Sequence, residues 1–134
     1  MRLWHKKLID ILPRQQLTGQ WRECCLIAKN LSNNGTPNHL LVNEILKYSL
    51  DHFFIYCALV YKEMKRRGFN VKAERLTRLT ANQNLNDTFL KYIDFNAPTP
   101  EFLFCWWHND RYLVQCYFNL QEKFDCGGIV PGRL

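Results

Sequence analysis

Residues 49–68 read SLDHFFIYCALVYKEMKRRG and contain the pattern that sets the fold class. Apolar side chains recur there at steps of three and four residues, the spacing of one buried helical face. These side chains are Phe53, Cys57, Val60, Tyr61 and Met64. Ser49 or Asp51 can begin the helix, and the run Lys65-Arg-Arg-Gly68 places cations and then glycine at its end. The stretch therefore predicts a helix.

Two other stretches have the same spacing. The first runs from about Pro13 to Asn30, and its expected inward side chains are Leu17, Trp21, Cys24, Ala28 and Leu31. The second runs from Asp110 to Cys126, and its expected inward side chains are Leu113, Cys116, Tyr117, Leu120 and Phe124. Shorter helices are expected at about 39–46 and 85–93, with turns rich in Asn, Gly and Pro at 33–37 and 96–100.

No stretch alternates apolar and polar side chains as a strand would. We therefore predict an all-α fold with three main helices, shorter helices and long loops. With 134 residues, the chain has the length of one compact domain, which we place over 1–134. Hydrophobic residues make up 47%, too many for a disordered chain. No apolar run approaches the ~18 residues of a membrane span, and no secretory signal is present, so we expect a cytoplasmic, monomeric protein.

The positive charges form two groups, although the formal net charge of +6 could by itself reflect an ordinary solvated surface. The first group comprises Lys62, Lys65, Arg66, Arg67, Lys72, Arg75 and Arg78. The second comprises Arg2, Lys6, Lys7, Arg14 and Arg22. Two such groups at separate places in the sequence indicate a polyanionic partner, most simply nucleic acid.

Six cysteines raise the question of disulfides or zinc. Zinc sites usually need ligand pairs at CxxC or HxxxH spacing, and the sequence has neither. Cys24, Cys57 and Cys116 instead fall at apolar helical positions, where a reduced thiol behaves as a small hydrophobe. We predict six free thiols, no metal and no cofactor.

The first helix has a polar face opposite its apolar stripe. At helical spacing, Glu23 shares a side with Gln16, Gly19 and Gln20, and Arg22 lies on the adjoining edge. Glycine inside a helix costs roughly 1 kcal/mol relative to alanine, so Gly19 needs a reason. Either a ligand or backbone approaches closely there, or the helix packs tightly against the N-terminal segment. Arg22 and Glu23 could also be an ordinary solvated pair.

The stretch LPRQQLTGQWRECC, residues 12–25, resembles the first helix of the pyrimidine-dimer DNA glycosylases. Two shorter matches follow in the same order. KRRGFNVK, residues 65–72, is similar to the end of the family's second helix, and LQEK, residues 120–123, to part of its third. The resemblance implies DNA repair by a glycosylase with AP-lyase activity on damaged pyrimidines, pyrimidine dimers above all, and double-stranded DNA as the partner.

The resemblance also implies roles for particular residues. Such enzymes attack the sugar of the damaged nucleotide with the N-terminal α-amine, release the base through an imine, and cut the strand by β-elimination. Because Arg2 is bulky, Met1 is expected to be retained, and its α-amine would be the nucleophile. Glu23 would be the catalytic carboxylate. The remaining positions, at or near the DNA in the family, are Arg2, Gln15, Arg22 and Lys123.

Two other functions stay open from the sequence. The chain could be a non-catalytic nucleic-acid-binding protein of the same fold, or a hydrolase or nuclease that uses His and Glu. His5 would lie near the α-amine, where it could act as a base or contact phosphate. The run 106–108, Trp-Trp-His, could form a stacking surface for bases or simply pack at a helix entry.

Overall fold

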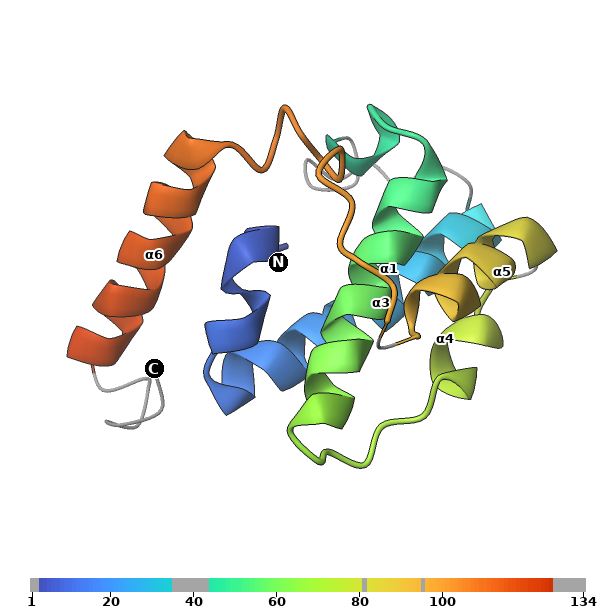
Figure 1. The fold of residues 1–134 in the computed structure, drawn as a ribbon, viewed down its shortest axis with the longest axis horizontal. Helices are drawn as coiled ribbons and strands as arrows, with labels where there is room; N and C mark the ends of the chain where they lie inside the picture. Colours follow the sequence, from blue (N-terminus) through green and yellow to red (C-terminus); the bar gives the residue numbers. More distant parts are fainter. Residues whose placement is uncertain (1–2, 35–43, 81, 95, 127–134) are drawn as a thin grey trace.

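The computed structural model describes residues 3–34, 44–80, 82–94 and 96–126 (Figure 1). Its elements are the 3-10 helix η1 (Lys6–Ile11) and the α-helices α1 (Arg14–Asn34), α3 (Leu50–Arg66), α4 (Glu74–Thr77), α5 (Gln83–Tyr92) and α6 (Asp110–Asp125). No strand occurs in these ranges, and the all-α prediction is confirmed. The short helices η1 and α4 were not predicted. The helix expected at 39–46 lies mostly outside the described residues.

Helix α3 occupies the centre of the fold. Every residue from 53 to 60 is buried, and not only the stripe that the periodicity predicts. The reason is visible in Figure 1, where α1 crosses behind α3, η1 lies to one side and α5 to the other. Contacts with α5 are the most extensive, followed by those with α1 and η1. A helix covered on several sides is apolar around much of its circumference.

Both ends of α3 follow the sequence signals. The Ser49 hydroxyl accepts a hydrogen bond from the Asp51 N–H at 3.2 Å and so caps the first turn. At the other end Gly68 has a φ of +83°. The Gly68 N–H donates to the Lys65 carbonyl at 3.0 Å, and the Phe69 N–H donates to the Met64 carbonyl at 2.9 Å. This pair of bonds is the Schellman motif, which needs the left-handed conformation that glycine adopts at no steric cost.

The apolar stripe of α1 is confirmed, since Leu17, Trp21, Cys24 and Ala28 are all buried and Leu31 packs against the core. In α6 the prediction is partly wrong. Cys116 and Leu120 are buried, but the Tyr117 side chain is 53% exposed. Helix α6 lies at the edge of the fold beside η1 (Figure 1) and buries only a narrow strip, so Tyr117 faces solvent.

All six cysteines are free thiols, as predicted; Cys24, Cys25, Cys57 and Cys116 are buried, and Cys105 and Cys126 are exposed. Among the helices that the structure describes, none combines the length and the apolar character of a membrane span.

We predict that Gly68→Ala destabilises the fold by roughly 1–2 kcal/mol, the cost of a left-handed conformation for a residue with a Cβ atom. Nothing described lies within 4 Å of the added Cβ, so the cost is conformational and not steric. Gly19→Ala is the matched control. Its backbone is helical, and its Cβ would meet only the Arg22 guanidinium at 3.9 Å, so we expect a gain of up to ~1 kcal/mol. Urea denaturation measures both, and equal effects would contradict this account.

Candidate active site

The polar face of α1 meets the N-terminal segment of the chain through Gln20. The Gln20 side chain is only 2% exposed, and its Oε1 accepts a hydrogen bond from the Trp4 N–H at 2.8 Å. A buried amide without a partner would cost about 1–3 kcal/mol. The pairing therefore holds the backbone of Trp4 against the middle of α1.

Two tyrosines from other helices hold the same piece of backbone. The Tyr56 hydroxyl, from α3, lies 2.6 Å from the Trp4 carbonyl oxygen and 3.0 Å from Gln20 Oε1, so two acceptors share its single proton. Complete burial raises the pKa of Tyr56 well above its ordinary value, which keeps that proton in place. The Tyr112 hydroxyl, from α6, donates to the Leu3 carbonyl at 2.7 Å. We call Gln20, Tyr56 and Tyr112 the N-terminal clamp.

Glu23 lies one helical turn beyond Gln20 and so shares its face of α1. The side chain is half-buried, yet its Oε2 atom is fully buried and has no hydrogen-bond partner among the described residues. Gln16, one turn before Gln20, has a buried Oε1 in the same condition. A buried oxygen without a partner calls for an explanation, and a functional role is one such explanation.

The other predicted site residues are spread over two helices. Arg22 and Gln15 are exposed on α1, Arg22 directly beside Glu23 in the sequence and Gln15 near the start of the helix. Lys123 is exposed in the last turn of α6, a separate helix (Figure 1). Met1 and Arg2 lie outside the described residues. The structure thus groups Gln15, Arg22 and Glu23 on α1 and places Lys123 elsewhere.

No backbone of the described residues approaches Gly19 closely. Among the described residues, only the Arg22 guanidinium lies within 4 Å of the position of its missing Cβ. The contact between α1 and the N-terminal segment is made by the next residue, Gln20, which binds the Trp4 N–H. Gly19 therefore leaves open space beside the Arg22 side chain.

His5, which the sequence offers as a base or a phosphate contact, is buried at the start of η1. It is 1% exposed, and its Nδ1 accepts from the Lys7 N–H at 3.1 Å, which caps η1. Its ring stacks on that of His108, with centroids 5.1 Å apart. The His108 Nδ1 in turn accepts from the Lys6 N–H at 2.9 Å. Burial lowers the pKa of both imidazoles, that of His108 to about 2, so both are neutral at pH 7. The Nε2 atoms of both rings are buried and, like Glu23 Oε2, have no hydrogen-bond partner among the described residues.

The three side chains at residues 106–108 differ in how deeply they are buried. His108 is buried and Trp107 is half-buried, whereas the Trp106 side chain is 78% exposed. The indole of Trp106 stacks on the ring of Tyr48, with centroids 5.8 Å apart. Within this run, only Trp106 is therefore accessible to a base.

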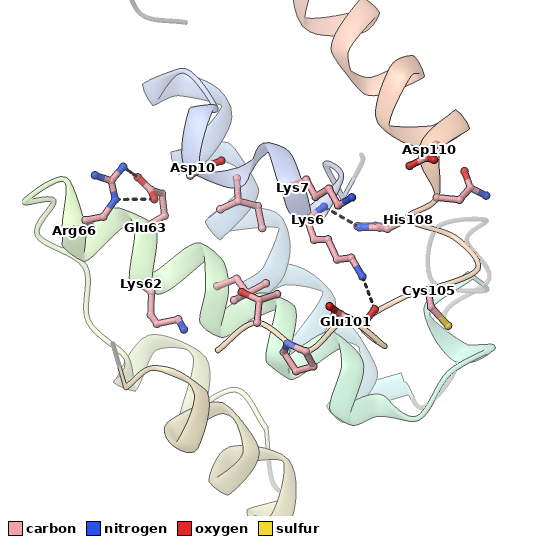
Figure 2. A pocket seen from close by; sticks show the side chains of 15 residues that line it. Lys6, Lys7, Asp10, Lys62, Glu63, Arg66, Glu101, Cys105, His108 and Asp110 are labelled. Atoms are coloured by element: carbon pink, nitrogen blue, oxygen red, sulfur yellow. Dashed lines mark hydrogen bonds and ion pairs between the residues drawn. The ribbon is translucent and has the colours of Figure 1, made fainter. Parts of the chain in front are cut away.

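A large cavity of about 880 Å³, drawn in Figure 2, has no residue of α1 in its lining. It runs between η1, the second half of α3 and residues 99–110. Several of its charged side chains have partners. Arg66 pairs with Glu63, and the Lys6 ammonium donates to the carbonyls of Glu101 and Leu103. The Lys6 contacts join η1 to the segment at residues 99–110, whereas the Arg66–Glu63 pair lies within α3. Within the described ranges, no group of His, Cys, Asp and Glu side chains could hold a metal ion.

Sequence reasoning missed the clamp. The helical spacing places Gln20 on the same face as Glu23 but gives it no partner, and no motif in the sequence singles out Tyr56 or Tyr112. Their partners lie far away in the chain: Trp4 is 52 residues from Tyr56, and Leu3 is 109 residues from Tyr112. No local pattern can indicate contacts of that separation.

The buried histidines predict a loss of stability in acid. A group whose pKa is lower in the folded state than its unfolded value near 6.5 takes up protons preferentially in the unfolded state as the pH falls. Below pH ~6.5 each pH unit should therefore cost roughly 1.4 kcal/mol through His108. Urea denaturation at pH 7 and pH 5 tests this. His108→Asn keeps an acceptor for the Lys6 N–H and removes the titration; if its pH dependence matched the wild type, His108 would not be responsible.

Comparison with known proteins identifies a family. A family model described as pyrimidine dimer DNA glycosylase matches residues 1–77. The matched region is more than half of the 134 residues and includes η1, α1, α3 and α4, but it ends before α6 and Lys123. No curated protein and no solved structure matches the chain significantly.

Proposed function

The chain belongs to the pyrimidine dimer DNA glycosylase family, and from this we propose that it excises damaged pyrimidines from double-stranded DNA and then cuts the strand as an AP lyase. In this proposal the Met1 α-amine is the nucleophile and Glu23 the catalytic carboxylate. One observation carries the assignment of Glu23. Its Oε2 is buried without a hydrogen-bond partner among the described residues, and Glu23 lies one turn from Gln20, the residue that binds the Trp4 backbone three positions after Met1.

The chemistry of the groups fits such a reaction. An α-amine has an ordinary pKa of about 7.7–8.0, so a useful fraction is neutral and nucleophilic at physiological pH, whereas a lysine near 10.4 would be almost fully protonated. Its nitrogen forms a bond to C1′ of the sugar while the bond from C1′ to the base breaks, and the base leaves with the electron pair. Opening of the sugar ring gives the imine. Loss of a C2′ proton then expels the 3′ phosphate.

Glu23 suits two parts of this sequence. A carboxylate beside C1′ stabilises the positive charge that develops on the sugar as the base departs. It can also carry protons between the amine, the sugar oxygen and C2′ during imine formation and elimination. Arg22, Gln15, Arg2 and Lys123 are assigned to DNA contacts; cations there bind phosphates and fix the duplex in position.

We predict that borohydride traps a covalent adduct between the protein and ultraviolet-irradiated duplex, and that Glu23→Gln lowers the trapping rate by about 10²-fold or more, the usual effect of losing a general acid–base group. DNA affinity should be preserved. Glu122→Gln is the control, because it makes the same charge change at an exposed position of α6. If the wild type forms no adduct yet binds the duplex, the chain is a DNA-binding protein without lyase chemistry, and the proposal fails. Chemical blocking of the Met1 amine should likewise abolish the adduct.

The clamp gives a second prediction for the same assay. Tyr112→Phe removes only the hydroxyl that binds the Leu3 carbonyl, so the start of the chain loses one of its restraints. We expect slower trapping with unchanged DNA affinity, because the amine spends less time correctly placed. Tyr117→Phe, an exposed tyrosine on the same helix, is the control. An equal effect of both variants, or weaker binding with unchanged trapping, would contradict a positioning role.

A further inference from the structure

The cations of the basic group at residues 62–78 separate into two kinds in the structure. Arg67 Nε lies 2.7 Å from a Glu63 carboxylate oxygen, and its guanidinium donates to the carbonyls of Leu12 at 2.6 Å and Asp10 at 3.0 Å. Arg66 binds the same carboxylate, and Lys62 donates to the Ala97 carbonyl at 3.0 Å. Arg67 and Lys62 join α3 to distant segments, whereas the Arg66 pair lies within α3 and that side chain is 61% exposed. The side chains of Lys65 and Lys72 are exposed and have no hydrogen bond or ion pair with a described residue.

Arg75 and Arg78 are different. They come from α4 and its C-terminal cap, and they face two cations of α1, Arg22 and Lys29, across a cleft of about 510 Å³. All four side chains are exposed. None of them has a hydrogen bond or an ion pair with any described residue. Four positive charges thus border one cleft that no described carboxylate lines, an arrangement whose self-repulsion an anionic ligand would relieve.

The remaining residues that line this basic cleft are uncharged. They are Cys25 and Leu26 of α1 and Leu79, just after α4. Burial raises the pKa of the Cys25 thiol to about 11, so these residues contribute no negative charge. Cations beside apolar side chains fit a ligand with phosphates at its edges and less polar groups between them.

We propose that the basic cleft binds the phosphodiester backbone of duplex DNA, with Lys29, Arg75 and Arg78 extending the contact assigned to Arg22. This inference rests on the proposed function and adds three binding residues to it. Arg22 borders the cleft and precedes Glu23 in α1, so the proposed catalytic carboxylate projects about 100° around the helix from it, on the adjoining face. A single phosphate would occupy only part of a cleft whose four cations come from two helices; a strand can engage all four.

The salt dependence of binding to undamaged duplex tests the inference in the full chain. Removal of one cation that neutralises a phosphate should lower the slope of log K against log salt by about 0.9. We therefore expect Lys29→Ala, Arg75→Ala and Arg78→Ala each to lower the slope by about that amount, and the triple variant by about three times as much. Affinity should fall equally for damaged and undamaged duplex, because phosphate contacts do not read the lesion.

Two controls make the result decisive. Lys91→Ala removes an equally exposed charge from α5, away from the cleft, and should leave the slope unchanged. Arg75→Lys retains a charge for phosphate and should retain the wild-type slope, which distinguishes the removal of a charge from damage to the fold. Unchanged slopes in the three alanine variants, or an equally large decrease in Lys91→Ala, would overturn the inference.

The two proposals can fail separately. If the slopes fall as expected but irradiated duplex gives no borohydride adduct with the wild type, the cleft binds DNA and the lyase assignment is wrong. If the adduct forms and the slopes of the cleft variants match the wild type, the chemistry stands and the DNA lies on another surface.

Discussion

The buried side chain of Gln20 is the constraint on which the candidate site depends. An amide in the middle of α1, 2% exposed, has to find partners inside the protein, and it finds the Trp4 N–H and the Tyr56 hydroxyl. These contacts fix the start of the chain against α1 and α3 at once. Of the described contacts that hold the N-terminal segment, these are the ones made directly with the helix that carries Glu23.

The rest of the N-terminal segment is held by side chains that reach backbone groups. Arg67, at the end of α3, donates to the carbonyls of Asp10 and Leu12 and thereby fixes the end of η1. The imidazoles of His5 and His108 accept the N–H groups at its beginning. A six-residue 3-10 helix has little stability of its own. These contacts give η1 a fixed place between α3 and α6, and α6 can then deliver the Tyr112 hydroxyl to Leu3.

Much of the fold could be predicted because the signals for the long helices are local. Apolar spacing, the Ser49 cap and Gly68 identified α3 almost to the residue. Periodicity shows that a face is apolar, but not how many neighbours will cover the helix. The apolar spacing therefore predicted too little burial for α3, which neighbouring helices cover on several sides. It predicted too much burial for Tyr117, because α6 packs against the fold on only one side. Helix α4 has four residues, too few to produce a periodic pattern.

The site could be predicted only in part, and the charges explain why. The resemblance pointed to Arg22 and Glu23, but the clamp joins groups too distant in the chain for any pattern to reveal. In the sequence, Arg66, Arg67, Arg75 and Arg78 belong to one basic group; what separates them is whether a carboxylate or carbonyl lies within reach. A cation that has such a partner stabilises the fold and has little left to offer a ligand. A charge count therefore overstates the surface that is free for a ligand. Four of the cations without partners among the described residues border the cleft between α1 and α4, and on this grouping the proposed DNA contact rests.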